Sequence, residues 1–121
     1  MLTFILVLVA GICNSIMDVL SFKFINSIFA KGGNWINPLN SWKNKWKNGD
    51  PKQGERFLFS STALVFLTDL WHLCKFIMLM CLCLGIVFYK PIFGIWDFIL
   101  FYCLFTFTFE LFYSYILIKK Q

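Results

Sequence analysis

The sequence predicts an all-α integral membrane protein with three transmembrane helices, and two observations carry this prediction. Hydrophobic residues make up 60% of the 121 residues and charged residues only 14%, with a mean hydropathy of +0.73, whereas soluble domains carry about 25% charged residues. The apolar residues fall into three blocks, about 2–30, 57–89 and 92–118. Each block exceeds the roughly 20 residues that a helix needs to cross a bilayer. A chain of this length forms a single membrane domain, residues 1–121.

The first block, about 2–30, is expected to stay in the protein as a membrane helix. A secretory signal would begin with a positively charged segment, which is missing here, and the apolar character continues beyond Cys13. All five cysteines lie within the apolar blocks. Cysteines in such a setting usually act as small hydrophobic residues, so neither a disulfide framework nor a zinc site is expected.

The loop between the first two blocks, residues 31–56, predicts the orientation of the chain. Basic residues gather in this loop and at the chain end: Lys31, Lys43, Lys45, Lys47, Lys52, Arg56, Lys119 and Lys120. Lys90 alone marks the connection between the second and third blocks. Because basic loops stay on the cytoplasmic side, we expect the N-terminus outside and both the loop and the C-terminus inside.

Within this loop, the stretch SWKNKWK predicts a short helix that lies at the membrane surface. Asn40 or Ser41 would cap it, and Trp42 and Trp46 are four residues apart on one face. Indoles favour headgroup depth, and lysines favour anionic headgroups at the cytoplasmic face. The lysines concerned are Lys43, Lys45 and Lys47. A solvated basic loop that only sets topology is the alternative, and no nucleic-acid partner is expected because the stretch is short.

The second block is expected to form one long helix over about 57–89, because no proline or glycine interrupts it before Gly85. A helix of that length would measure about 50 Å and would have to tilt or project into the cytoplasm. The third helix, about 92–118, should begin close to Pro91, since proline is common in the first turn of a helix.

Each apolar block carries ionisable residues, and these are predicted to meet at one depth in the inner half of the membrane. If each helix is centred on its block, the four residues lie in a slab under about 10 Å thick. They are Asp18, Asp69, His72 and Glu110, with Lys75 on a nearby face. Further polar residues extend a stripe on each helix: Asn14, Ser21, Ser61, Thr106 and Ser114. Such stripes should face one another or a partner chain rather than lipid.

Three uses of this buried polar cluster stay open. Ion pairs with Lys75 and protonated His72, or hydrogen bonds between helices, would give it a structural role. Carboxylates and an imidazole could instead relay protons or ions along a polar seam. A metal site is the third use, because carboxylates with one imidazole suit Mn, Fe, Zn or Mg. Its candidate ligands are Asp69, His72, Asp18 and Glu110. The pattern names no particular cofactor and no catalytic residue.

The predicted function is that of an accessory or structural membrane subunit, in a homo-oligomer or a larger membrane complex. Three helices alone shield few polar groups from lipid, which favours assembly. A proton- or ion-conducting pore or holin-like effector is the first alternative, and a metal-dependent membrane enzyme acting on a phospholipid-like substrate is the second. Enzymatic activity is not favoured. Frequent lysine, phenylalanine and asparagine suggest an AT-rich genome, hence a bacterial or phage protein of the bacterial inner membrane.

Overall fold

The computed structural model describes residues 2–118, and every regular element in that range is helical. Three helices are long and apolar enough to cross a membrane. They are α1 (Leu2–Phe22), α3 (Leu70–Val87) and Gly94–Ile116, which is α4 (Asp97–Leu111) flanked by the turns Gly94–Trp96 and Phe112–Ile116. The all-helical fold with three candidate membrane spans is therefore confirmed, and it is compatible with a multi-pass membrane protein.

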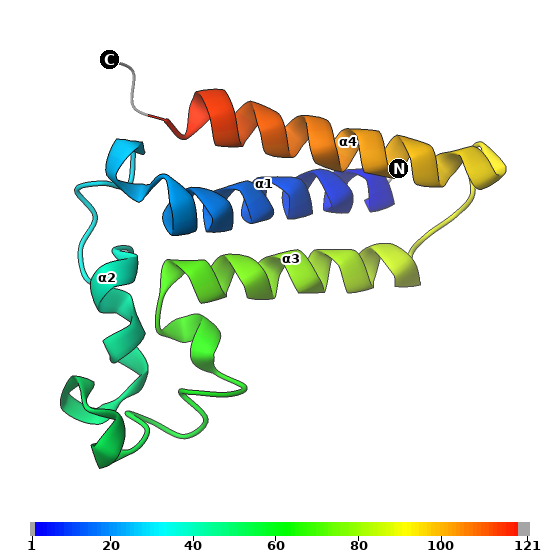
Figure 1. Cartoon of the computed structure of the whole chain (residues 1–121). Coiled ribbons are helices and arrows are strands. Elements are labelled where there is room, and N and C mark those ends of the chain that lie inside the picture. Colours follow the sequence, from blue (N-terminus) through cyan, green and yellow to red (C-terminus); the bar gives the residue numbers. More distant parts are fainter. Residues whose placement is uncertain (1, 119–121) are drawn as a thin grey trace.

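The central helix of the bundle is α1, with α3 on one side and α4 on the other (Figure 1). Both outer helices pack along α1, whereas no comparable contact joins α3 to α4 within the described residues. In the apolar stretches, 44% of the residues of α1 are buried, against 17% in α3 and 11% in α4. The outer helices therefore leave most of their surface open to lipid or to another protein.

Two glycines allow α1 to approach its neighbours closely. A Cβ atom added at Gly11 would lie 3.1 Å from the carbonyl oxygen of Phe105 and 3.3 Å from Cβ of Thr108, both in α4. On the other side, Gly85 of α3 accepts a hydrogen bond from the hydroxyl of Thr3 at 2.9 Å. Small residues at such contacts let helix backbones pack together in a membrane, where van der Waals contact drives helix association.

The second apolar block does not form one long helix, so the predicted helix over 57–89 is wrong over residues 57–69. The helix α3 begins only at Leu70, and the residues before it form turns. Asp69 is the N-cap residue, because its carboxylate accepts the backbone N–H of His72 at 2.7 Å. Phe59 also has a positive φ of 63°, which a continuous right-handed helix cannot contain.

The first block is likewise helical over only part of its length, since α1 ends at Phe22 rather than near residue 30. Beyond it, the buried Ser27 donates a hydrogen bond from its hydroxyl to the carbonyl of Phe24 at 2.7 Å. Such bonds compete with helix continuation. The next backbone N–H, of Ile28, donates to the carbonyl of Leu117 at 2.9 Å, which ties the end of α1 to the end of the α4 segment.

The loop between α1 and α3 runs across one end of the bundle, transverse to the long helices (Figure 1). It contains α2 (Pro38–Ser41) and the short turns Trp42–Lys45, Lys47–Gly49, Pro51–Gln53 and Val65–Leu67. The stretch SWKNKWK, expected to form one short helix, is therefore divided between two short helical turns, Trp42–Lys45 and Lys47–Gly49. Its contact with a membrane surface stays a prediction.

One buried carboxylate closes the turn between α3 and α4. Asp97 accepts the Tyr89 hydroxyl at 2.7 Å and the backbone N–H groups of Ile92 and Phe93 at 3.0 Å each. The hydrogen bond to Asp97 raises the pKa of the Tyr89 hydroxyl, because the carboxylate favours the protonated phenol. This turn fixes where α4 starts and hence which face α4 turns toward α1.

We expect Gly11→Leu to lower the stability of the bundle by about 1–3 kcal/mol, the usual cost of overpacking a tight contact. The added side chain would meet the backbone of Phe105, which cannot move without shifting α4. Unfolding by increasing mole fraction of sodium dodecyl sulfate, followed by circular dichroism, measures the change. Gly33→Leu is the control, because no atom lies within 4 Å of a Cβ added there. Equal resistance of wild type and Gly11→Leu would contradict the close contact.

Candidate functional site

Asp69 and His72 form a hydrogen-bonded pair at the start of α3. The carboxylate oxygens of Asp69 lie 2.7 and 2.9 Å from Nδ1 of His72. An ionised carboxylate can only accept hydrogen bonds, so Nδ1 carries the proton in this contact. The Asp69 side chain is 4% exposed and the His72 side chain 28%. The pair therefore presents the second ring nitrogen, Nε2, as the part that is free to bind a proton, a metal or a substrate.

A contact between α1 and α3 holds the helix turn that carries His72. The indole of Trp71 donates to the hydroxyl of Ser21 at 3.1 Å, and its ring meets the imidazole at 4.9 Å between centres. Lys75 lies one turn further along with Nζ 5.5 Å from the centre of the Trp71 ring. This cation–π geometry places the Lys75 charge beside an aromatic face. Within residues 2–118, Lys75 forms no ion pair with a carboxylate, which was one of the uses of the cluster that the sequence left open.

The loop is attached to the start of α3 by polar side chains that sequence reasoning missed. The side-chain amide of Asn44 donates to the carbonyls of Thr68 at 2.9 Å and of Asn34 at 3.2 Å. The indole of Trp35 donates to the carbonyl of Leu67 at 3.2 Å. In the sequence, Asn44 is the single side-chain amide between the lysines of the predicted interfacial stretch. This is a weak signal, and the anchoring role of Asn44 becomes evident only from its hydrogen-bond partners.

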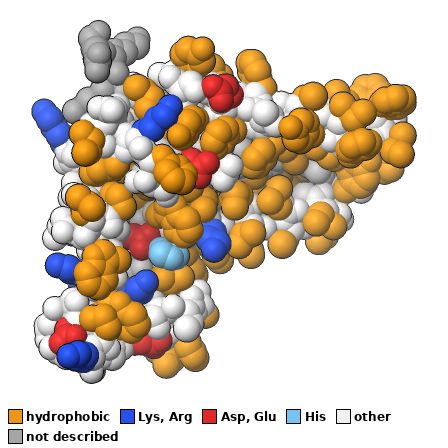
Figure 2. Space-filling model, in the orientation of Figure 1, with side chains coloured by type: hydrophobic (Ala, Val, Ile, Leu, Met, Phe, Trp, Pro, Cys, Tyr) orange, Lys and Arg blue, Asp and Glu red, His pale blue; other side chains and the backbone are white. Residues whose placement is uncertain are grey.

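Asp18 and Glu110 lie toward the same end of the bundle as the Asp69–His72 pair but do not join it. Acidic side chains lie over α4, over α1 and at the start of α3 on the face shown in Figure 2. Within residues 2–118, the only ion pair is that between His72 and Asp69. Glu110 is exposed and accepts the hydroxyl of Ser114 from the following turn. The four residues thus share one end of the molecule without forming a single cluster.

The four candidate metal ligands do not assemble into a metal site within the described chain. No three histidine, cysteine, aspartate or glutamate side chains among residues 2–118 lie close enough together to hold one ion. Asp69 and His72 supply one carboxylate and one imidazole, whereas protein zinc sites use three or four ligands. The pair can orient an imidazole as a base or hydrogen-bond acceptor, but by itself it makes an incomplete metal site.

The polar stripe of α4 points away from α1. Thr106 and Glu110 are exposed, while Thr108 is buried, and it is Phe105 and Thr108 that meet Gly11 of α1. The expectation that the three stripes face one another is therefore wrong for α4. The other expected arrangement, in which a stripe faces a partner chain, is the one that this helix leaves open.

The remaining stripe residues are dispersed. Asn14 is half-buried in α1, and Ser21 is used by the Trp71 indole. Ser61 lies in the turns before α3 and donates its hydroxyl to Glu55, so it does not share a helix face with Asp69 as expected. No continuous polar seam runs through the part of the chain that the structure describes.

The predicted membrane-surface residues lie on the transverse loop, with each tryptophan beside a lysine. Nζ of Lys43 lies 5.5 Å from the centre of the Trp42 ring, and Nζ of Lys45 lies 5.8 Å from that of Trp46. Lys47 is exposed. Each indole is thus paired with an ammonium group, which is the combination expected at lipid headgroups.

Sequence reasoning also overlooked Lys23, which directly follows α1. Its Nζ lies 4.0 Å from the centre of the Tyr113 ring in the last turn of the α4 segment. The residue fell inside the first apolar block, so it was expected to be part of a longer helix. Lys23 instead marks the end of α1 and joins α1 to the α4 segment through a cation–π contact.

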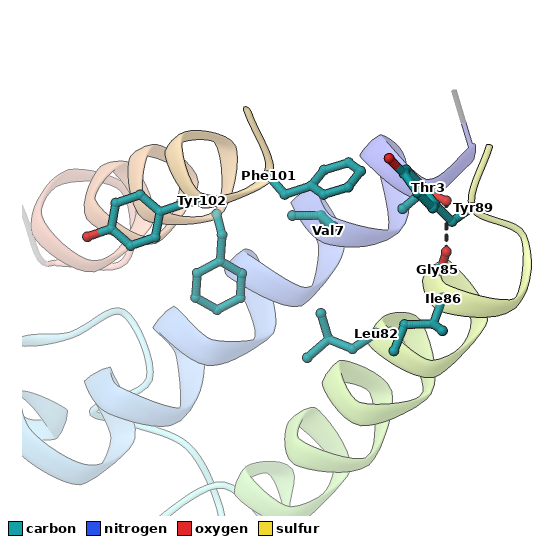
Figure 3. Close-up of a pocket in the computed structure, with 9 residues that line it drawn as sticks. Thr3, Val7, Leu82, Gly85, Ile86, Tyr89, Phe101 and Tyr102 are labelled. Atoms are coloured by element: carbon teal, nitrogen blue, oxygen red, sulfur yellow. Dashed lines mark hydrogen bonds between the residues drawn. The ribbon is translucent and has the colours of Figure 1, made fainter. Parts of the chain in front are cut away.

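A separate cavity of about 550 Å³ lies at the opposite end of the bundle, where α3 and α4 diverge over α1. Figure 3 shows Val7, Leu82 and Phe101 around it, with the Thr3 hydroxyl turned to the Gly85 carbonyl. Its walls are apolar apart from hydroxyl groups. The cavity can hold hydrocarbon, but it offers no acid–base pair for chemistry.

We expect Asp69→Asn to preserve the start of α3, because asparagine also serves as an N-cap, and to remove the fixed tautomer of His72. In the wild type, neutral His72 should carry its proton on Nδ1, opposite the carboxylate. Nitrogen-15 NMR of the imidazole distinguishes the two tautomers. Asp69→Ala is the comparison that also loses the cap, with a stability cost of about 1–2 kcal/mol. A wild-type imidazole protonated on Nε2 would contradict the geometry.

No protein family, no curated protein and no solved structure matches this chain, so the site is interpreted from its own residues.

Proposed function

We propose that this chain is a membrane subunit that self-associates through the exposed polar face of α4, in the bacterial inner membrane. The observation that supports it is the position of Glu110, exposed on the side of α4 that faces away from α1. An acidic side chain in a membrane helix that faces lipid costs up to about 2.5–3.5 kcal/mol on insertion scales, the value that applies at the helix centre. A second protein surface over this face would remove that cost.

A second copy of the chain matches this face chemically. The α4 segment presents the hydroxyls of Thr106 and Ser114 on either side of the Glu110 carboxyl group. In a two-fold arrangement, the Thr106 hydroxyl can donate to the Glu110 carboxyl group of the partner helix, while the Ser114 hydroxyl donates to Glu110 of its own helix. Hydrogen bonds of the first kind are common between membrane helices. Lipid-exposed area on α4 is also large, since only 11% of its apolar stretch is buried.

The transverse loop fits a place at the cytoplasmic surface. Its lysines would set the topology by the positive-inside rule, with the N-terminus outside. Exposed apolar side chains lie in the same segment, with exposed fractions of 74% for Leu39, 73% for Leu58 and 50% for Phe59. Apolar groups beside cations on one surface suit the boundary between headgroups and acyl chains.

Neither a pore nor a metal-dependent enzyme has an observation of this kind in its favour. Within residues 2–118 the polar stripes share no common seam, and the Asp69–His72 pair supplies two ligand groups. Self-association through α4 is therefore the function that the geometry supports best.

We expect the wild type to form a homo-oligomer in lipid nanodiscs and Glu110→Leu to weaken its association about three- to twentyfold, the range given by measured interhelical hydrogen bonds. Native mass spectrometry at several protein-to-lipid ratios gives the association constant. The control is Cys83→Leu, an exposed position of α3. A wild type that stays monomeric at every ratio, or an unchanged Glu110→Leu, would overturn the proposal.

We expect Lys52→Cys, on the exposed part of the loop, to react with a membrane-impermeant maleimide only after the membrane is opened. Intact bacterial cells and inverted membrane vesicles provide the two sides, and labelling is detected by a gel shift. A chain in which the five native cysteines are replaced by alanine is the background. Labelling of Lys52→Cys in intact cells would show that the loop lies outside, which is opposite to the proposed orientation.

A further inference from the structure

A small basic cavity lies in the loop, formed where the chain turns back on itself between residues 43 and 56. Its volume is about 260 Å³. It is lined by Lys43, Asn44, Trp46, Asn48, Gly49 and Arg56. Both charged residues in this lining are cations, and no acidic side chain reaches it.

The two sides of the cavity are joined by backbone hydrogen bonds, which bring Lys43 and Arg56, 13 residues apart in the sequence, around one space. The N–H of Lys47 donates to the carbonyl of Gly54 at 3.0 Å, and the N–H of Arg56 donates to the carbonyl of Lys45 at 2.9 Å. These bonds make the cavity part of the folded loop rather than a chance approach of two long side chains.

A buried serine fixes the side that carries Arg56. The hydroxyl of Ser60 accepts the backbone N–H of Arg56 at 3.1 Å and donates to the carbonyl of Lys45 at 2.7 Å. Ser60 is fully buried. At the other side, Gly49 adopts a positive φ of 74°, and a Cβ atom there would lie 3.4 Å from Cβ of Lys43. Its hydrogen atom leaves room beside the Lys43 side chain.

The acidic residues of the loop accept hydrogen bonds from other groups and do not line the cavity. Asp50 accepts the backbone N–H of Lys52 at 2.9 Å, and Glu55 accepts the backbone N–H of Phe59 at 3.0 Å and the hydroxyl of Ser61. The one ion pair among residues 2–118, between His72 and Asp69, lies outside this cavity. Two cations thus share one cavity without a counter-charge, an arrangement that a bound anion would relieve.

The donors around the cavity suit a phosphate group. The guanidinium of Arg56 offers a planar fork that matches phosphate oxygens, and the ammonium of Lys43 adds a second charge. The side-chain amide of Asn48 uses one N–H for Gln53 at 2.8 Å and retains the other. We infer that this cavity binds the phosphate ester of an anionic phospholipid headgroup. The inference rests on the proposed membrane topology and is independent of self-association through α4.

The test uses the full chain in mild detergent and measures lipid binding by native mass spectrometry. The probes are short-chain phosphatidylglycerol and the matching diacylglycerol, which lacks the phosphate. We expect phosphatidylglycerol to bind and the double variant Lys43→Gln/Arg56→Gln to weaken its binding at least about tenfold, because hydrogen bonds to charged groups are lost. Lys31→Gln/Lys52→Gln removes the same charge outside the cavity, and its binding should stay within about twofold of the wild type.

Two further arms identify the source of the phosphate. Displacement of the lipid by inorganic phosphate at millimolar concentration would show that the cavity recognises phosphate alone, whereas no displacement would show that the lipid's glycerol is also needed; both outcomes support the site. Equal weakening in the two double variants, equal binding of diacylglycerol, or displacement by a short single-stranded oligonucleotide would overturn it. Far-ultraviolet circular dichroism and thermal unfolding verify that each variant is folded. The oligomeric state, which the native mass spectra also report, tests the α4 proposal separately.

Discussion

The carboxylate of Asp69 determines where the membrane part of the second apolar block begins. It accepts the backbone N–H of His72 and contacts the imidazole Nδ1, so one buried group both caps α3 and orients the histidine. Because α3 starts after Asp69, residues 57–69 are not part of the helix and form turns that belong to the loop. The buried Ser60, which organises the basic cavity, belongs to this segment.

The central position of α1 explains how the charges are distributed. Gly11 of α1 allows close approach of α4, and Gly85 of α3 allows close approach of α1, so the inner faces of α3 and α4 both pack against α1. The face of α4 that remains must then carry Thr106 and Glu110 outward. The exposed acid on α4 is thus a consequence of close packing at Gly11, rather than of a separate polar site inside the bundle.

Composition and hydropathy were sufficient to predict the helical fold and the three candidate spans, because lipid solvation depends mainly on those quantities. The break before α3 was also encoded, as Thr68 and Asp69 precede an apolar run in the manner of a helix cap. Hydropathy averages conceal such a cap within an apolar block. The outward stripe of α4 was not predictable, since both of its faces mix aromatic and hydroxyl residues and only contact with α1 chooses between them.

Helix length decides which of the two carboxylates, Asp69 or Glu110, needs a partner. An α3 of 18 residues measures about 27 Å, close to the thickness of the hydrocarbon layer, so an α3 that spans the membrane would place its N-cap residue Asp69 at the boundary and not at mid-depth. There water and the basic loop can solvate the Asp69–His72 pair. Glu110 lies about 9 Å inside the end of the α4 segment at Ile116. A group at that depth, turned away from α1, is stabilised by a neighbouring protein surface more than by the headgroup region, which is why assembly is expected through α4 and not through α3.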